Sequence, residues 1–373
     1  MVTLTGPRQS GKSTLARAAF PDHTHVNLER PDLREAAEQD PRALLTSGAH
    51  GLVLDEVQRV PALLSWIQAA VDDDPRPGRF ILTGSNQHAL SDGVAQTLAG
   101  RTTVLRLLPP DLEELRRFPS HPTTLWETVH AGAFPRIHDV GIPAERWLSG
   151  YVATYLERDV RQLLRVSDLS TFQSFVRLAA GRTSQELNLA SLGADAGVSQ
   201  PTARGWLGVL ETSFLAQRVP AFHRNTRKQI VKAPKLHLVD AGLAAWLIGV
   251  RGPVELATHP LRGALFETWV ASEIVKQRYH RAAAARVSHW RESRGVEIDL
   301  VVDDGATLWL VEVKSGQTIA SDWFGPLRAA TAQLAGEGRA ARPVIVYGGD
   351  EPARRHDVDV IPWHQIGRLA PTS

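Results

Sequence analysis

Cysteine is absent from this sequence of 373 residues. Disulfides, thiolate nucleophiles and cysteine-bound zinc or iron–sulfur sites are therefore excluded, and any metal must be held by oxygen or imidazole ligands. A long apolar run is also absent, because the nearest candidate, LVDAGLAAWLIGV, is interrupted by Asp240. The first residues lack the basic, apolar and cleavage pattern of an export signal. We therefore expect a cytoplasmic protein with no membrane partner.

Neither sign of charge predominates. The chain has 42 Lys and Arg against 40 Asp and Glu, and its pI is about 9.0. This balance permits nucleic-acid binding but argues for it only where basic residues cluster. The length exceeds that of one typical domain, so we expect two or three separate cores in a modular chain.

The chain opens with a strand and a phosphate-binding loop. Met1 to Thr5 is apolar, GPRQSGKS follows, and a helical run, Thr14 to Phe20, comes next. This is the P-loop pattern: the glycines let backbone N–H groups surround the β-phosphate, Lys12 reaches the β- and γ-phosphates, and Ser13 can hold Mg²⁺. An ordinary glycine-rich turn is the alternative. The predicted ATP contacts are Gly6, Pro7, Arg8, Gln9, Ser10, Gly11, Lys12, Ser13 and Thr14.

An apolar strand ending in two acids supports the nucleotide site. In Gly51-Leu-Val-Leu-Asp55-Glu56, the strand should deliver its acids at its C-terminal edge. Asp55 would bind Mg²⁺ through water, and Glu56 would orient or deprotonate the attacking water. A solvated strand end is the alternative.

Two more strands complete the expected sheet. Arg79 to Thr83 leads into Gly84-Ser85-Asn86, where Asn86 is the first choice and Ser85 the second for a polar side chain that senses the γ-phosphate. Thr102 to Leu107 is the fourth strand. Strands that alternate with helices predict a three-layer α/β fold.

These motifs carry a resemblance. The P-loop, Asp55-Glu-Val-Gln, LTGSN, LAGR and LRLLPP, with GAFP, YLERDV and EVKSG further on, are similar to those of bacterial and archaeal AAA-type ATPases with a nuclease-like C-terminal domain. The resemblance implies an arginine that acts on the γ-phosphate, from the lid or from a neighbouring subunit, and hence a possible homo-oligomer. Arg101 and Arg158 are the candidates, with surface ion pairs as the alternative. Members usually have a segment before the P-loop, so adenine contacts are not predicted and a start upstream of Met1 is left open.

The middle of the chain is expected to be helical. We predict an ATP-binding domain over 1–112, a helical lid that caps the nucleotide over 113–181, a winged helix over 182–250 and a nuclease-like domain over 251–373. Gly197 lies at the turn of a helix-turn-helix pattern, Ser199 caps its second helix and Pro201 lies in the first turn.

A basic hairpin follows the helix-turn-helix pattern. It contains no acid from Thr212 through Val239, and its cations are Arg218, Arg224, Arg227, Lys228, Lys232 and Lys235. Cations gathered beside a helix-turn-helix favour contacts with the DNA backbone. A winged helix that only packs against protein is an equal alternative.

A β-hairpin is predicted within EIDLVVDDGATLWLVEVKSG, residues 297–316, with Asp304-Gly305 at its tip and paired residue numbers that sum to 609. One face should be wholly apolar, with Val296, Ile298, Leu300, Val302, Trp309, Val311 and Val313. The other face should gather Glu297, Asp299, Glu312 and Lys314. Diagonal neighbours lie about 7 to 8 Å apart, so Asp299 and Glu312 could share one Mg²⁺, with Lys314 orienting water or stabilising charge. An ordinary ion pair on a solvated face is the alternative.

This pattern resembles the PD-(D/E)XK nuclease superfamily, with Asp299, Glu312 and Lys314 at the motif positions and no proline before the aspartate. The resemblance adds Glu267 as a metal ligand from the preceding helix, with Glu273 as a weaker candidate. Many domains of this fold bind without cleaving. We therefore expect an ATP hydrolase coupled to a Mg²⁺-dependent nuclease acting on DNA, or an ATP-driven switch whose C-terminal domain binds nucleic acid or a protein without cutting. A transcription factor without enzymatic activity is the weakest reading.

Overall fold

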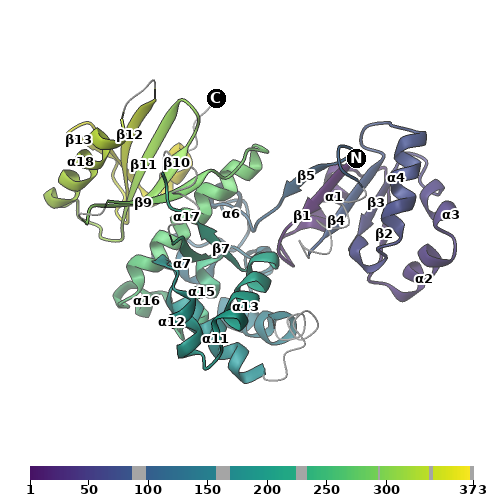
Figure 1. The fold of residues 1–373 in the computed structure, drawn as a ribbon, viewed down its shortest axis with the longest axis horizontal. Coiled ribbons are helices and arrows are strands. Elements are labelled where there is room, and N and C mark those ends of the chain that lie inside the picture. Colours follow the sequence, from purple (N-terminus) through teal and green to yellow (C-terminus); the bar gives the residue numbers. More distant parts are fainter. Residues whose placement is uncertain (86–97, 157–168, 224–232, 293–294, 336–338, 370–373) are drawn as a thin grey trace. The chain divides into compact units, whose positions relative to one another are not determined.

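The computed structural model describes residues 1–85, 98–156, 169–223, 233–292, 295–335 and 339–369 (Figure 1). Contacts divide the chain into two compact units: Met1–Pro109 with Thr212–Phe214, and Pro110–Glu211 with Leu215–Ser373. The predicted lid, winged helix and C-terminal domain thus lie in one compact unit, and the four-part division of the chain stays a prediction.

The first unit is a parallel α/β domain. Its five-stranded sheet has the order β2-β3-β4-β1-β5. The elements are β1 Val2–Thr5, α1 Lys12–Ala19, β2 Thr24–Asn27, α2 Pro31–Gln39, α3 Pro41–Thr46, β3 Leu52–Asp55, a 3₁₀ turn Val57–Arg59, α4 Leu63–Asp73, β4 Phe80–Gly84 and β5 Thr103–Arg106. The four predicted strands are present to within a residue or two at each end, and β2 was missed.

The central strands β3 and β4 are buried on both faces, which explains their nearly continuous apolar sequences. Leu52, Leu54 and Leu82 belong to the larger core, which also holds residues of α2, α3 and α4. Val53 and Ile81, at the alternate positions, pack with Ala16 of α1. Helices therefore cover the two faces, as the three-layer prediction requires.

The second unit contains helices and two sheets. Its helical elements are α6 Leu112–Leu115, α7 Leu125–Ala131, α8 Pro135–Asp139, α9 Ala144–Tyr151, a π-helix Val152–Leu156, α11 Leu169–Gly181, α12 Leu189–Asp195, α13 Gln200–Thr212, α15 Ala241–Leu247, α16 Pro253–Thr258, α17 Arg262–His280, α18 Phe324–Leu334 and 3₁₀ segments Ser321–Trp323 and Trp363–Leu369. Its strands are β6 Gln185–Glu186, β7 Ala216–Val219, β8 Lys235–Leu238, β9 Val287–Arg291, β10 Glu297–Asp303, β11 Thr307–Lys314, β12 Ala340–Tyr347, β13 Ala353–Arg355 and β14 Val358–Pro362.

The helix-turn-helix pattern folds as its turn residues predict. Gly197 has φ 71° between α12 and α13, and the Thr202 backbone N–H donates to Ser199 Oγ at 3.3 Å. The antiparallel strands β6, β8 and β7 form a small sheet with β8 in the middle. The predicted hairpin is thus β7–β8, whose connecting residues Arg224, Arg227, Lys228 and Lys232 lie outside the described residues. The name winged helix stays a prediction.

A six-stranded sheet, ordered β13-β14-β12-β11-β10-β9, forms the C-terminal part of the second unit. Helix α17 contacts β11, and α18 contacts β10, β11 and β12 (Figure 1). The hairpin β10–β11 is present, but its predicted register is wrong. Leu300 pairs with Val311 and Asp303 with Leu308, so paired numbers sum to 611. The Asp304 N–H donates to the Thr307 carbonyl, so the two residues at the tip are Gly305 and Ala306, one position later than predicted.

The predicted division of this hairpin into one apolar and one polar face is also wrong. By alternation, Val301, Leu308 and Leu310 belong to the face predicted to gather the polar residues, yet they are buried in a core that includes Leu327 of α18. Leu300 and Val311, at alternate positions, are buried as well. Since two helices pack on the sheet, apolar residues are needed at successive positions, and the polar groups are confined to one end of the strands.

Among the described residues, no helix combines the length and the apolar character needed to cross a membrane.

The C-terminal half of α17 holds the first residues of the second unit through a buried ion pair. Glu273 and Lys276 are almost fully buried, and Lys276 Nζ lies 2.8 Å from Glu273 Oε1. Glu273 Oε2 accepts the Leu112 N–H at 2.8 Å, and Lys276 Nζ donates to the Pro110 carbonyl at 3.0 Å. Glu273, a weaker candidate metal ligand from the sequence, therefore has this role as a partner of Lys276.

We predict that Glu273→Ala lowers the free energy of unfolding by about 3–5 kcal/mol, because it leaves Lys276 buried without its carboxylate. Urea unfolding followed by tryptophan fluorescence measures this change. The control is Glu113→Ala, which removes an exposed pair with Arg116 and should cost less than about 1 kcal/mol. Equal losses for the two variants would contradict this account of Glu273.

Candidate functional sites

The P-loop joins β1 to α1 in a conformation that its glycines permit. Gly6 has φ 155°, and a Cβ there would lie 2.0 Å from the Leu107 carbonyl oxygen. Gly11 has φ 95°, in the left-handed region that favours glycine. Lys12 is the first residue of α1, is buried, and donates through Nζ to the carbonyls of Gly6 at 3.1 Å and Pro7 at 2.7 Å. The loop therefore folds back over a buried ammonium group.

Burial lowers the pKa of Lys12 to about 8, against the opposing charges of Glu56 and Asp55. The remaining predicted nucleotide contacts lie around this loop. Arg8 is 3.9 Å from Glu29, Gln9 has φ 59°, and Thr14 is exposed on α1. Ser10 Oγ is buried and has no hydrogen-bond partner among the described residues, so it can bond a ligand oxygen.

Ser13, Asp55 and Thr83 form a chain of side-chain hydrogen bonds across the sheet edge. Ser13 Oγ donates to Asp55 Oδ2 at 2.7 Å, and Thr83 Oγ1 donates to Asp55 Oδ1. The three residues come from the start of α1, the end of β3 and β4. The C-terminal edge of parallel strands thus brings together the hydroxyl and carboxylate oxygens that Mg²⁺ prefers. The predicted pair Ser13 and Asp55 is adjacent, and sequence reasoning missed Thr83.

Glu56 is held in an uncommon backbone conformation directly after β3. Its φ and ψ are 55° and 46°, the left-handed region that few residues other than glycine adopt. Its carboxylate oxygen Oε2 accepts hydrogen bonds from Ser85 Oγ at 3.0 Å and from Gln58 Nε2. The Glu56 side chain is therefore held in place next to the hydrogen-bonded group of Ser13, Asp55 and Thr83. A residue that orients water needs such a fixed position.

The two remaining γ-phosphate assignments stay predictions. Asn86 and Arg158 lie outside the described residues, whereas the second-choice sensor Ser85 contacts Glu56. Arg101 forms an ion pair with Asp72 of α4, with Nε 2.6 Å from Oδ1. Within its own unit Arg101 therefore has a surface partner.

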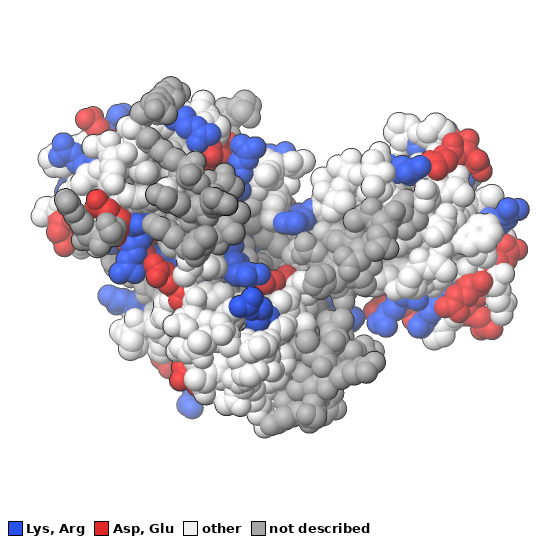
Figure 2. All heavy atoms as spheres, in the orientation of Figure 1, with Lys and Arg blue, Asp and Glu red and all other residues white. Residues whose placement is uncertain are grey.

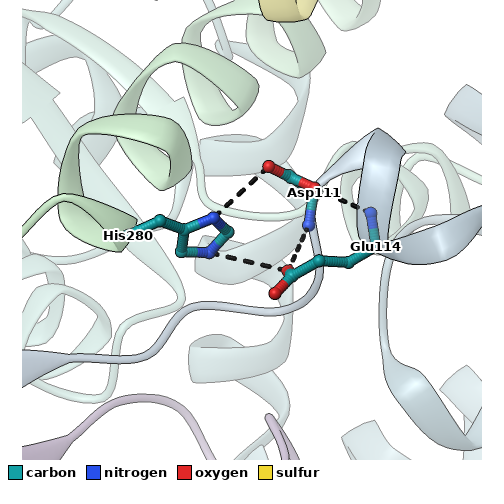
Figure 3. A group of neighbouring side chains, drawn as sticks. All are labelled: Asp111, Glu114 and His280. Carbon is teal, nitrogen blue, oxygen red and sulfur yellow. Dashed lines mark hydrogen bonds and ion pairs between the residues drawn. The ribbon is translucent and has the colours of Figure 1, made fainter.

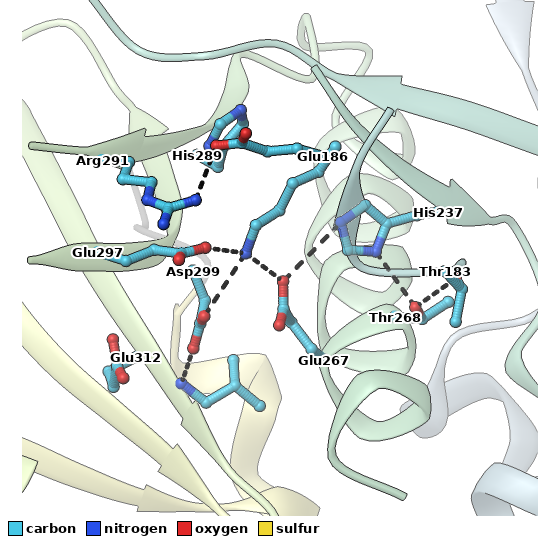
Figure 4. Close-up of polar contacts among 12 residues, drawn as sticks. Thr183, Glu186, His237, Glu267, Thr268, His289, Arg291, Glu297, Asp299 and Glu312 are labelled. Atoms are coloured by element: carbon cyan, nitrogen blue, oxygen red, sulfur yellow. Dashed lines mark hydrogen bonds and ion pairs between the residues drawn. The ribbon is translucent and has the colours of Figure 1, made fainter. Parts of the chain in front are cut away.

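A second group of carboxylates lies between α17 and the C-terminal sheet. Figure 4 shows Glu267, Glu297 and Asp299 converging from α17 and β10, with Glu312 of β11 close to Asp299. Asp299 Oδ2 accepts the Val313 N–H at 2.8 Å, and Lys314 Nζ lies 2.7 Å from Glu312 Oε1. The paired part of the hairpin ends at Leu300 and Val311, so Asp299 and Glu312 come directly after the last pair.

We call Glu267, Glu297, Asp299 and Glu312 the carboxylate cluster. Burial and the charges of neighbouring residues shift the pKa values of these acids. Burial, reinforced by the charge of Asp299, raises the pKa of Glu267 to about 8 and that of Glu312 to about 7. Burial also raises the pKa of Asp299. Perturbed carboxyl groups gathered at one place are typical of functional sites.

The residue that sequence reasoning misplaced is Lys235. It was expected on a basic surface hairpin, but only 3% of it is exposed. Its Nζ lies 2.7 Å from Glu297 Oε1, 3.0 Å from Glu267 Oε1 and 3.7 Å from Asp299 Oδ1. Burial alone would lower the pKa of Lys235, but the three carboxylates outweigh it and raise this pKa. Lys235 therefore cannot contact DNA as predicted, because its charge is enclosed by the cluster.

The other described cation of that hairpin is also paired. Arg218 Nε lies 2.5 Å from Glu211 Oε1. On the face shown in Figure 2, the described Lys and Arg side chains are interspersed with Asp and Glu. The described residues of this face therefore add no continuous basic patch to the sequence argument for DNA.

A third polar group gathers Asp111, Glu114 and His280 at the other end of α17 (Figure 3). His280 Nδ1 lies 3.3 Å from Asp111 Oδ2, and Nε2 lies 3.5 Å from Glu114 Oε2. Asp111 and Glu114 also form a capping box at the start of α6. Since both imidazole nitrogens face carboxylates, we interpret the group as an ion-paired anchor for α6.

Three family models match successive parts of the chain. An AAA domain family matches residues 1–116, and two domains of unknown function, DUF8612 and DUF4143, match residues 122–253 and 262–366. Together with the P-loop and the parallel sheet, the first match makes the N-terminal part a P-loop domain of the AAA ATPase type. The C-terminal sheet and its carboxylates lie in the DUF4143 region, and the family match names no activity for that region.

Two similar proteins are the uncharacterized proteins Rv2008c of Mycobacterium tuberculosis and Mb2031c of Mycobacterium bovis. Each is 28% identical over 369 residues, which is 98% of this chain and 80% of the relative. Two solved structures are also similar. A Thermotoga maritima RuvB variant has 18% identity and TM-score 0.31, covering 59% of this chain and 82% of that one. The Aeropyrum pernix ORC2 protein in its ADP form has 17% identity and TM-score 0.29, covering 58% and 80%. Likeness at this level carries no argument.

We predict a pH-dependent contribution of His280 to stability. The hydrogen bond to Asp111 and the charge of Glu114 raise the pKa of His280, against burial and Lys276. The stabilisation is complete below the ordinary histidine pKa of about 6.5 and is lost as pH rises through the raised value. His280→Gln should cost about 1 kcal/mol near pH 5.5 and less near pH 9. Urea unfolding at both pH values tests this, and a larger loss at the higher pH would contradict it.

Proposed function

We propose that this protein binds and hydrolyses ATP with Mg²⁺ at the P-loop. The observation that carries the proposal is the chain from Ser13 through Asp55 to Thr83 beside the buried Lys12. It supports the proposal because side-chain oxygens and an ammonium group lie together at the edge of a parallel sheet, where triphosphates bind in P-loop domains. The AAA domain match over residues 1–116 supports the same function.

Each residue has a distinct role in this proposal. Lys12 and the loop N–H groups hold the β- and γ-phosphates, and Ser13 and Asp55 hold the metal directly and through water. Bound Mg²⁺ would neutralise charge on the phosphate oxygens. Glu56 orients the attacking water or accepts its proton, with Ser85 and Gln58 fixing the carboxylate. The uncommon backbone of Glu56 is consistent with a strained catalytic position.

An arginine from a neighbouring copy completes the proposed site in a homo-oligomer. Arg101 is the described candidate, and it would have to exchange Asp72 for a phosphate. The exchange is feasible because both side chains of the pair are partly exposed, and such pairs contribute about 0–1 kcal/mol.

We propose that the C-terminal domain is the part on which ATP turnover acts. A Mg²⁺-dependent nuclease acting on DNA is the first candidate, supported by Asp299, Glu312 and Lys314 at one end of the β10–β11 hairpin and by Glu267 facing them from α17. These are suitable oxygen donors for Mg²⁺, and Lys314 is placed to steady negative charge. The helix-turn-helix α12–α13 would contact the DNA backbone.

A specific observation favours the second candidate, an ATP-driven switch whose C-terminal domain binds DNA or a protein without cutting. Lys235 already places a positive charge between Glu267, Glu297 and Asp299. With this internal counter-charge, the carboxylate cluster does not need a metal in order to be stable.

For the ATPase, we predict that Glu56→Gln lowers ATP turnover by about 10²-fold to 10⁴-fold while nucleotide binding persists, because it removes only the base. Lys12→Ala should weaken nucleotide binding itself. Phosphate release and fluorescent-nucleotide titration separate the two effects. The control is Glu35→Gln, an exposed acid of α2. Phosphate release that is insensitive to Lys12→Ala would remove the ATPase assignment.

For the nuclease candidate, we predict that the wild-type protein with ATP and Mg²⁺ or Mn²⁺ cuts single-stranded, duplex or branched DNA, and that Glu312→Ala lowers the rate by about 100-fold or more, because a metal ligand is lost. Gel electrophoresis of labelled DNA measures the rate. Glu351→Ala, which changes an exposed acid, should leave cutting unchanged. Cleavage that persists in Glu312→Ala eliminates the nuclease, and DNA binding with no cleavage supports the switch.

A further inference from the structure

The position of Lys235 is fixed by backbone as well as by charge. It lies on β8, the middle strand of the small sheet, where it pairs with Glu186 on one side and Val219 on the other. A residue paired on both sides cannot move its backbone without breaking two strand ladders. The ammonium group thus extends from the three-stranded sheet to carboxylates of α17 and β10.

Contacts around β8 fix its position relative to the six-stranded sheet. Ala221 forms a bridge with His289 of β9, and the His289 N–H donates to the Pro220 carbonyl at 2.9 Å. His289 Nε2 is 3.1 Å from the Ala233 carbonyl, two residues before Lys235. The small sheet is therefore joined to the edge of the six-stranded sheet beside the carboxylate cluster.

The geometry around Lys235 Nζ is that of a cation site. Three carboxylates from two elements approach one ammonium group at 2.7, 3.0 and 3.7 Å, and its side chain is 4% exposed. Two of these acids, Glu267 and Asp299, are the predicted metal ligands. The fourth acid of the cluster, Glu312, is paired with Lys314 instead, at 2.7 Å. The carboxylates of Glu267, Asp299 and Glu312 are suitable ligands for a divalent cation. The Lys235 ammonium group, however, already lies against Glu267 and Asp299.

We propose that Lys235 is an internal cation that closes the carboxylate cluster to divalent metal ions, so that metal binding requires the Lys235 side chain to leave. The ammonium and a divalent ion compete for the same oxygens of Glu267 and Asp299, and electrostatic repulsion disfavours both being present. The competition depends only on these side chains. It does not rest on ATP hydrolysis at the P-loop, and a metal-dependent nuclease at this cluster would need the Lys235 side chain to leave first.

The test is direct Mn²⁺ binding to the full chain, without nucleotide, followed by the electron paramagnetic resonance signal of free Mn²⁺. Lys235→Met keeps an unbranched side chain, one atom shorter, and removes its charge. This variant should bind Mn²⁺ about tenfold or more tightly than the wild type, a change of the size seen when groups around metal ligands are altered. Adding Asp299→Asn should abolish the gain, which would locate the ion at the cluster.

The matched control is Lys314→Met, which removes the other lysine of the group. Lys314 contacts Glu312 alone among the cluster acids, and its side chain is 33% exposed. Its removal should change Mn²⁺ affinity by less than about threefold, the gain from losing a partly screened charge. Equal gains for Lys235→Met and Lys314→Met would mean that general charge, and not occupancy of the site, sets the affinity, and would overturn the proposal.

Folding of the variant is checked by circular dichroism with EDTA and with Mn²⁺. A Lys235→Met protein that folds only with Mn²⁺ supports the proposal, because the metal then replaces the ammonium group. If Lys235→Met does not fold in either condition, Lys235→Met with Glu297→Gln removes one acid along with the cation. Mn²⁺ affinity in a folded variant equal to that of the wild type, or a gain that survives Asp299→Asn, would show that Lys235 does not block the site.

Discussion

The hydrogen bond from Ser13 to Asp55 is the interaction on which the nucleotide site depends. It joins the first turn of α1 to the end of β3, and Thr83 of β4 bonds the other oxygen of the same carboxylate. Parallel strands bring such residues together at one edge, although they are far apart in sequence. The glycines at positions 6 and 11 allow the loop to wrap Lys12, and Glu56 is the first residue beyond the strand. Position along a buried strand therefore determines the chemistry of this site.

The carboxylate cluster is also built from residues that are far apart in sequence, and it includes a cation. Strands β10 and β11 and helix α17 supply its acids, and β8 supplies the cation that contacts three of them. Removing a buried charge is costly when its partners remain, so this one ammonium group ties β8 to α17 and β10. Helix α17 carries Glu267 near its start and Glu273, Lys276 and His280 further along, where they hold residues 110–114. One rigid helix thus links the cluster to the start of the second unit.

The sequence predicted those features that depend on local spacing. The P-loop, the Asp55–Glu56 strand end, the Gly197 turn with its Ser199 cap and the meeting of Asp299 with Glu312 were all readable, because each follows from residues close together in the chain or from strand pairing. The register of β10–β11 was not readable, since the run Asp303-Asp304-Gly305-Ala306 allows a tip at Asp304-Gly305 or, as observed, at Gly305-Ala306. Strand β2 was missed because His25 and Asn27 interrupt its apolar pattern.

The larger error concerned Lys235, and its cause is physical. A lysine within a run of basic residues has the pattern of a solvated surface, and only the tertiary fold shows that acids more than thirty positions away enclose it. Glu297 was noted on the hairpin but given no role for the same reason. Thr83 was passed over because a threonine at the end of an apolar strand is ordinary. Long-range charge pairing leaves no periodic signal in a single sequence.

The most direct test of the central claim is a crystal structure with Mn²⁺ and a non-hydrolysable ATP analogue, in which anomalous scattering locates the metal. The account predicts an anomalous peak bonded to Ser13 Oγ, with Asp55 reaching it through water and the phosphates against Lys12. A triphosphate bound elsewhere, or an anomalous peak that is not next to Ser13 and Asp55, would contradict the account.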